Sequence, residues 1–361
     1  MGYTLCYILF PYSHRIVRRK LGFVDSICHS SPSYCPTMSS RTVTTASTSK
    51  SSDKGRSAVV VPRPSASLVV VNGQNEVLLV QRNPRAVAFG GVTVFPGGNY
   101  DRTQDDSFEI TAIRETFEES GLLMASPTTP GGALPTDSVL DEARHAIHSQ
   151  KMRFREFLDQ HGLKPDTDSL MPFTQWITPV GPPRRFHTRF YVSFLPSASS
   201  SGFTSGDKQA RLPKPDGGKE VITARFLHPK AAIAEFDSQK ITFMPPQYYI
   251  LHTLASILKG SVNTPEQRAK VRELAYGKFG RMVINPRRLK GAEEAAGLAV
   301  LTYEGDETRG GSPGRRHRAT IFARQGGITE KIVLERNFDI YTEIEENAFL
   351  QRQGSAVASK L

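Results

Sequence analysis

Three glutamates, Glu115, Glu118 and Glu119, stand at offsets of zero, three and four within residues 95–122. On a helix of about 3.6 residues per turn, these offsets place the three carboxylates on one face. Like charges held so close repel one another, so this pattern predicts a cation beside the helix. The Pro-Gly-Gly sequence at 96–98 predicts a turn whose backbone can approach a ligand closely. A divalent metal ion with a diphosphate is the simplest chemistry that uses both features.

Strand and helix patterns surround this segment and predict an α/β fold. The sequence NGQN at 72–75 lies between two aliphatic runs and indicates a hairpin. Asp106 is predicted to cap the glutamate-bearing helix, with Glu109 completing a box-like arrangement, and Gly121 to end it. Strands are expected at 65–71, 76–81, 92–95, 173–178, 188–195, 220–227, 319–322 and 332–335, and further helices at 138–161, 229–236, 247–258 and 265–275.

The order of these patterns predicts one main domain with additions. The helical pattern after the glutamates is interpreted as an insertion within the domain, because strands resume after it. We expect a disordered leader over 1–57 and the main domain over 58–280, with the helical insertion over about 126–170. A C-terminal extension over 281–352, packed on the main domain, and a flexible tail over 353–361 complete the expected organisation.

The net charge of +11, from 46 Lys and Arg against 35 Asp and Glu, indicates either general solubility or a preference for polyanions. No basic motif interleaved with aromatic residues is present, which argues against nucleic acid and favours a phosphorylated small molecule. Beyond Cys6, Cys28 and Cys35 the chain has no disulfide, no thiolate zinc site and no cysteine nucleophile. No apolar run reaches the roughly 20 residues that span a membrane.

Both ends of the sequence carry targeting patterns. The last residues, Ser359-Lys360-Leu361, form the tripeptide that the peroxisomal import receptor reads. The first residues are rich in Ser, Thr and Arg and weakly resemble a mitochondrial presequence, and Met38 is an alternative start. We therefore expect a peroxisomal protein that binds the import receptor through its C-terminus, with the mitochondrion as the alternative location.

The segment RETFEESGL at 114–122 resembles the core of the Nudix box, and FPGG at 95–98 matches the turn that precedes it. This resemblance implies a Nudix fold, an α/β/α sandwich with a mixed sheet, here with a helical insertion and C-terminal helices. It also implies a hydrolase that depends on Mg²⁺ or Mn²⁺ and leaves the general base open. The metal ligands that it implies are Glu115, Glu118, Glu119, the Gly97 carbonyl and, as a further acidic residue, Glu220.

Arg114 stands four residues before Glu118 and is predicted to orient that carboxylate, so the expected catalytic residues are Arg114, Glu115 and Glu118. The chain departs from the family pattern in three ways. The loop acid that the family places eight residues before the arginine falls on Asp106, and the loop from 98 to 114 is two residues longer than usual. Thr116 replaces a large aliphatic residue.

The flanking segments at 78–98, 176–192 and 243–251 resemble one branch of the family, the coenzyme A diphosphatases of peroxisomes and mitochondria. That branch cleaves coenzyme A or its thioesters into 3′,5′-ADP and (acyl-)4′-phosphopantetheine. Its stricter motif has an arginine where this chain has Val87. The arginines expected to hold the substrate phosphates are Arg82, Arg85, Arg184, Arg185 and Arg189. Phe186 and Tyr191 are expected either to stack on adenine or to belong to the core.

Two other functions stay open at this point. One is a Nudix hydrolase of another nucleoside diphosphate derivative, such as NADH or ADP-ribose. The other is a non-catalytic domain that only binds a nucleotide. The intact set of glutamates argues against a loss of catalysis.

Overall fold

The computed structural model describes residues 60–86, 90–195, 221–289, 291, 297–324 and 328–345. The predictions for the leader, the cysteines and the C-terminal tripeptide lie outside these residues, as do those for Val87 and Glu220. Among the helices of the described segments, none combines the length and the apolar character that crossing a bilayer requires.

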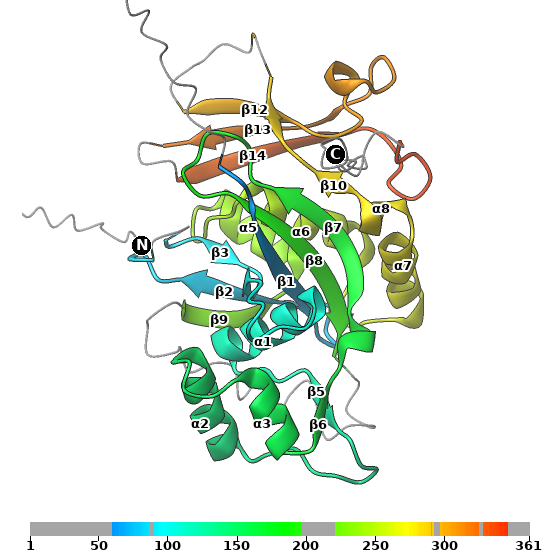
Figure 1. Cartoon of the computed structure of the whole chain (residues 1–361). Helices are drawn as coiled ribbons and strands as arrows, with labels where there is room; N and C mark the ends of the chain where they lie inside the picture. Colours follow the sequence, from blue (N-terminus) through cyan, green and yellow to red (C-terminus); the bar gives the residue numbers. More distant parts are fainter. Residues whose placement is uncertain are drawn as a thin grey trace, which may run out of the picture. The chain divides into compact units, whose positions relative to one another are not determined.

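A mixed sheet of eight described strands forms the centre of the fold (Figure 1). The strands are β1 (Arg63–Val71), β2 (Val77–Arg82), β3 (Thr93–Val94), β4 (Gly97–Asn99), β7 (Met171–Ile177), β8 (Phe186–Phe194), β9 (Val221–Leu227) and β10 (Val283–Ile284). Their order is β10-β7-β8-β1-β2-β3, with β4 paired to β1 and β9 paired to β2. Because β1 runs parallel to β8 but antiparallel to β2, the expected mixed sheet is confirmed.

Strand β1 is buried on both faces, as its continuous aliphatic run predicts for a central strand. Val69 and Val71 point into one core, and Leu68 and Val70 point into the other. Alternate side chains of one strand thus pack against two different layers, which gives the sheet helices on both sides.

Helix α1 (Phe108–Ser120) packs against β1 and β4. Its cap is Ser107, whose hydroxyl accepts the backbone N–H of Ile110 at 3.3 Å. The expectation that Asp106 caps the helix is therefore wrong by one residue, because the backbone is still extended at Ser107 and becomes helical only at Phe108. Gly121 ends the helix with a φ of 72°, the left-handed conformation that glycine adopts without strain.

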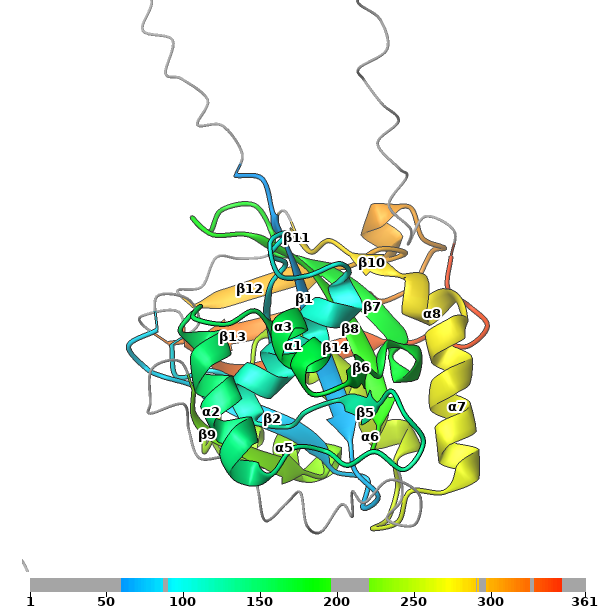
Figure 2. The same cartoon turned by 60° about the horizontal axis from the view of Figure 1, so that its bottom comes forward.

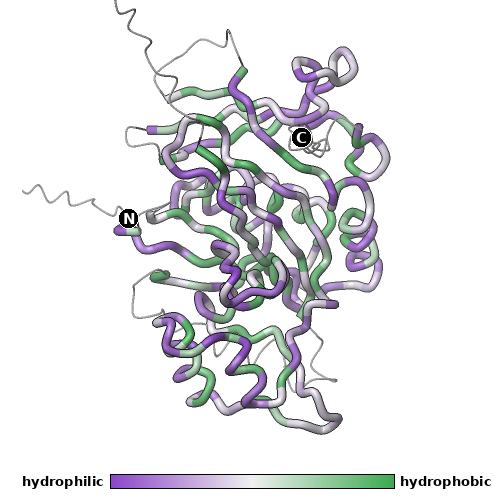
Figure 3. The backbone as a smooth tube through the Cα atoms, viewed as in Figure 1, coloured by the Kyte–Doolittle hydropathy of each residue, from purple (hydrophilic) through white to green (hydrophobic). Residues whose placement is uncertain are grey.

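The segment expected as one helix over 138–161 forms two helices, α2 (Asp137–His148) and α3 (Phe154–Gln160). Gln150 lies between them with a φ of 58°, a left-handed conformation that a continuous helix cannot contain. Both helices alternate between hydrophobic and hydrophilic stretches (Figure 3). A two-stranded sheet of β5 (Ala125–Pro127) and β6 (Leu163–Pro165) and the 3₁₀ turn η1 (Thr167–Ser169) complete this insertion.

The insertion shares a core with α1. The ring of Phe157 on α3 stacks on the ring of Phe117 on α1, with centroids 5.7 Å apart, and both side chains are fully buried. In Figure 2, α1 and α3 lie in front of β1. The position of the glutamate-bearing helix therefore depends on the insertion as well as on the sheet.

The second core holds the remaining helices and the C-terminal segment. These helices are α5 (Pro229–Asp237), α6 (Pro245–Ile257), α7 (Pro265–Tyr276) and α8 (Lys278–Arg281). After them a four-stranded sheet follows, made of β11 (Arg287–Arg288), β12 (Leu298–Thr302), β13 (His317–Ala323) and β14 (Thr329–Arg336), with a 3₁₀ turn η2 (Glu307–Arg309). Ile321 and Ile332 of this sheet join the core of α6.

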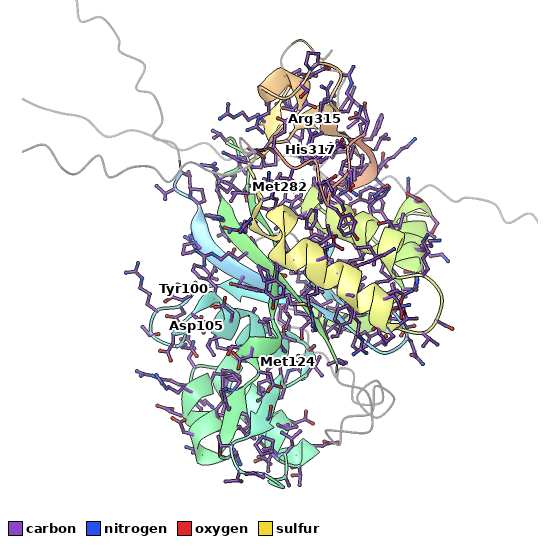
Figure 4. The ribbon with its side chains drawn as sticks, turned by 90° about the vertical axis from the view of Figure 1, so that its right-hand side faces the viewer. Tyr100, Asp105, Met124, Met282, Arg315 and His317 are labelled. Carbon is purple, nitrogen blue, oxygen red and sulfur yellow. The ribbon has the colours of Figure 1, made fainter. Side chains whose placement is uncertain are left out.

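An ion pair holds the C-terminal sheet in register. The guanidinium of Arg318 donates to both carboxylate oxygens of Asp306, at 2.7 and 2.6 Å. Asp306 also accepts the backbone N–H of His317, a residue that lies in this sheet (Figure 4). These bonds hold the pKa of Asp306 below its usual value even though burial opposes the charged form.

Replacing Phe157 tests whether the insertion stabilises the whole domain. We expect Phe157→Ala to lower the free energy of unfolding by about 3–5 kcal/mol, because it leaves a cavity against Phe117. The control is Phe322→Ala, at a side chain that is 37% exposed on β13, where we expect a loss of less than about 1 kcal/mol. Denaturant unfolding followed by circular dichroism measures both. Equal effects would contradict a shared core.

Candidate active site

The described residues surround a cavity of about 820 Å³. Strands β1, β4, β7, β8 and β12 and helices α1, α2 and α6 all contribute side chains to its lining. A cavity of this size falls in the upper part of the usual range for small-molecule sites, about 300–1,000 Å³. It therefore offers more room than a diphosphate alone needs.

The three glutamates of α1 line this cavity together, as the helical spacing predicts. Glu119 accepts the backbone N–H of Gly97 at 3.1 Å, which ties α1 to the glycine turn. The guanidinium of Arg82 lies 3.5 Å from the other oxygen of Glu119. Glu115 and Glu118 both contact Arg114. The acidic face of the helix is thus held in place by arginine and by backbone.

Arg114 is buried at the centre of this arrangement. One of its terminal nitrogens donates to Glu115 at 2.9 Å and to Glu118 at 2.8 Å. Its Nε and its other terminal nitrogen donate to the two oxygens of Asp105, at 2.8 and 2.9 Å. Burial alone would lower the pKa of Arg114, but the hydrogen bonds to Asp105 and the surrounding carboxylates raise it well above its usual value. Arg114 stays charged and contacts Glu118, the carboxylate that the sequence predicts it to orient.

The acid of the loop that pairs with this arginine is Asp105 and not Asp106. The Asp105 side chain is fully buried and also accepts the hydroxyl of Thr111 and the backbone N–H of Asp101. Asp106 is 69% exposed and pairs with the equally exposed Arg155. The longer loop turns back on itself at Asp101, which brings Asp105 beneath the helix; Figure 4 shows Asp105 beside α1. Asp105 and Asp106 are the same residue type, and the contacts of Asp105 with Asp101 and Thr111 distinguish it from Asp106.

The glycine turn packs closely against β1 and α1. Gly97 pairs with Ser67 of β1, and a Cβ atom on Gly97 would lie 2.4 Å from the backbone oxygen of Ala66. A Cβ atom on Gly98 would lie 2.4 Å from the carboxylate of Glu115. Both contacts are closer than real Cβ atoms come, and at Gly97 the neighbour is backbone that cannot move aside, so glycine lets this turn lie against β1.

The five expected phosphate-binding arginines divide into two groups. Arg82, Arg85 and Arg184 line the cavity, together with Arg63, which the sequence did not single out. Arg185 is buried and donates to the backbone oxygens of Thr178 and Val60, at 2.9 and 2.7 Å.

Strand alternation explains why the fifth arginine, Arg189, lies outside the cavity. Phe186, Thr188 and Phe190 of β8 line the cavity, so Arg189 and Tyr191 face the other side of the sheet. There Arg189 lies over the ring of Phe108, 3.9 Å from its centroid. Arg189 therefore does not reach the cavity, and of the two aromatic candidates only Phe186 does.

The insertion also contributes to the site, which the sequence did not predict. His148 and Gln150, at and after the end of α2, line the cavity, and His148 Nδ1 lies 3.6 Å from a carboxylate oxygen of Glu118. Arg144, one turn earlier, donates to the backbone oxygen of Glu118 at 2.7 Å. Nothing in the local pattern of α2 marks these residues, because their role depends on how the insertion folds back onto α1.

The carboxylate oxygens of the three glutamates suit a hard divalent cation, but they are not arranged as a preformed metal site. Among the residues that the structure describes, no group of three or more His, Cys, Asp or Glu side chains is placed to hold a metal ion. The carboxylates instead contact Arg82, Arg114 and the Gly97 N–H. Mg²⁺ usually binds through one or two carboxylates, with waters and substrate phosphates completing its shell. The carboxylate oxygens of Glu115, Glu118 and Glu119 would meet that requirement if an ion replaced an arginine contact.

Replacing Asp105 and Asp106 in turn tests which aspartate holds Arg114. We expect Asp105→Asn to lower the free energy of unfolding by about 3 kcal/mol, because it removes one charge of a buried pair. Asp106→Asn is the matched control, and we expect a change of less than about 1 kcal/mol, as is usual for an exposed ion pair. Thermal and denaturant unfolding measure both variants. A larger loss in Asp106→Asn would restore the assignment made from the family spacing.

Comparison with known proteins agrees with this geometry. Residues 103–254 match the family model of the NUDT19 Nudix domain. The chain is 32% identical over 166 residues to acyl-coenzyme A diphosphatase NUDT19 of Gallus gallus, which covers 42% of this chain and 41% of that protein. It is 30% identical over 165 residues to the Homo sapiens protein of the same name, covering 42% and 40%.

The aligned part is thus about two fifths of the length of these curated relatives. A crystal structure of a NUDIX hydrolase from Alicyclobacillus acidocaldarius is 24% identical, with a TM-score of 0.41, and covers 54% of this chain and 92% of that chain. The Nudix box on α1 and the match over residues 103–254 identify this part of the chain as a Nudix domain of the NUDT19 type.

Proposed function

We propose that the protein is a metal-dependent diphosphatase that cleaves coenzyme A or acyl-coenzyme A into 3′,5′-ADP and (acyl-)4′-phosphopantetheine. The observation that carries this proposal is the composition of the cavity. Three carboxylates for a divalent cation and four arginines for phosphate groups line the same space. The names of the two relatives, both acyl-coenzyme A diphosphatases, favour this substrate class.

Glu115, Glu118 and Glu119 would hold Mg²⁺ or Mn²⁺, since their oxygens line one cavity beside the glycine turn. The ion, when bound, neutralises charge on a diphosphate and lowers the pKa of an attacking water. Arg114 keeps Glu118 aimed at this position through its 2.8 Å contact. Two hydrogen bonds to Asp105 hold the guanidinium of Arg114 in this position.

Arg82, Arg85 and Arg184 would bind the substrate phosphates. Guanidinium groups match phosphate oxygens in a forked geometry and remain charged at any physiological pH. Coenzyme A carries a 3′-phosphate in addition to its diphosphate, whereas NADH and ADP-ribose carry only the diphosphate. Several arginines along one cavity therefore favour coenzyme A among the nucleotides considered.

A panel of substrates tests the proposed function. We expect the purified protein with Mg²⁺ or Mn²⁺ to release 3′,5′-ADP from coenzyme A and an acyl-coenzyme A, and a chelator to abolish this release. NADH, ADP-ribose and coenzyme A without its 3′-phosphate should be cleaved at least about ten-fold less efficiently, the scale of one lost charged hydrogen bond. Chromatography of the products measures each reaction. Preferred cleavage of NADH or ADP-ribose would replace the proposal, and binding without cleavage would identify a non-catalytic domain.

The metal site is tested by Glu118→Gln, which keeps the shape of the side chain and removes its charge. We expect kcat to fall at least about a hundred-fold, as for other groups placed at the reacting centre. Glu142→Gln, at an exposed position of α2, is the control and should retain full activity. Circular dichroism establishes that both variants fold. Unchanged turnover in Glu118→Gln would show that the metal site has been misplaced.

A further inference from the structure

One part of the cavity lining is apolar, and three distant parts of the chain meet there. Trp176 and Ile177 come from β7, Met244, Pro245 and Pro246 from the start of α6, and Pro286 and Leu301 from the C-terminal segment. We call these seven residues the apolar compartment. They carry no charge, in contrast to the glutamates and arginines that line the rest of the cavity, so this compartment is unsuited to a phosphate.

The compartment is built around a firmly held tryptophan. Trp176 donates its indole N–H to the hydroxyl of Thr174 at 3.1 Å. Its ring packs edge-on against Tyr249 of α6 and Tyr303 of the C-terminal segment, with centroids 5.4 and 5.3 Å away. Thr174 has a φ of 68° at an irregularity of β7. Because aromatic contacts from two other elements fix the ring, this wall is preformed.

The C-terminal segment supplies one wall of the compartment. Strand β10 pairs with β7 and places Ile284 opposite Trp176, two residues before Pro286. Leu301 lies on β12, beside the inward-facing Ala319 of β13. Ile284, Pro286 and Leu301 fall outside 103–254, the part that matches the family model. Pro286 and Leu301 of the compartment therefore come from outside the part of the chain that matches the family model, and the other five residues come from inside it.

The start of α6 is also unusually apolar. A helix N-terminus normally offers free N–H groups to anions, but the first two positions of α6 are Pro245 and Pro246, which have none. The next residue, Gln247, is only 7% exposed and lines the cavity. Its Oε1 has no hydrogen-bond partner among the described residues. A ligand here must be mainly apolar with an occasional polar group, which describes an acylated pantetheine arm.

We propose that the apolar compartment binds the thioester-linked acyl chain of the substrate and that Leu301 is a specificity-determining residue for chain length. This inference rests on the proposed function and extends it to the part of the substrate beyond the diphosphate. Gln247 is the polar group that would hydrogen-bond an amide or the thioester at the root of the chain. The glutamates and arginines are shared by all coenzyme A species, whereas Leu301 contacts only acylated ones.

The experiment compares free coenzyme A with acetyl-, octanoyl- and palmitoyl-coenzyme A as substrates of Leu301→Trp. The larger side chain fills the compartment, so we expect kcat/KM for octanoyl- and palmitoyl-coenzyme A to fall at least about ten-fold through KM, the effect of misfitting a methylene or more. Free coenzyme A should change by less than about two-fold, since its binding site is untouched. Val333→Trp, on the outward, 38% exposed side of β14, is the matched control and should change nothing.

Leu301→Ala is the second variant, in case tryptophan disturbs the fold. The enlarged compartment should shift the preference toward longer chains and again leave free coenzyme A unchanged. Release of 3′,5′-ADP with the same chain-length profile in wild type, Leu301→Trp and Leu301→Ala would overturn the inference. An equal loss on free and acylated coenzyme A in folded variants would overturn it as well. Absence of 3′,5′-ADP from every coenzyme A species with the wild-type protein would instead overturn the proposed function.

Discussion

The buried guanidinium of Arg114 is the interaction on which the site depends. Three carboxylates on one helical face repel one another, and a buried arginine is costly without acidic partners, so each requires the other. Arg114 balances the charges of Glu115 and Glu118. The backbone N–H of Gly97 donates a hydrogen bond to Glu119. Asp105 then ties the preceding loop to the same group. Helix, loop and glycine turn thus form one unit, and none can shift without exposing an unpaired buried charge.

Periodicity in the sequence was sufficient to predict this helix and the face that carries its glutamates. It also predicted the central strand β1, whose aliphatic run is buried on both sides. The neighbouring aspartates show where periodicity fails. Asp105 and Asp106 have the same chemistry, and only contacts with Asp101 and Thr111, set by the path of the loop, decide which one is buried. A family spacing cannot give that answer when the loop is longer than usual.

The arginines illustrate a second limit. A run of basic residues before and within β8 predicts a basic surface, but strand alternation sends Arg189 to the opposite face, and Arg185 serves the backbone of a neighbouring turn. The insertion shows a third limit, because its contribution of His148 to the cavity depends on the break at Gln150. Side chains that enter a site through tertiary packing leave little trace in local sequence.

Different parts of the chain supply the acidic and the apolar lining of the cavity. Residues of the Nudix box provide the acidic lining, to which we assign the cation and the diphosphate in the proposed function. The apolar lining comes from the start of α6 and from β12, and Trp176 is clamped between Tyr249 and Tyr303 where these parts meet. Because the C-terminal sheet packs into the same core as β1, its position is coupled to the catalytic helix through the sheet and not through a flexible linker. If the apolar lining binds the acyl chain, changes in this sheet would alter which substrate fits while the reaction chemistry stays the same.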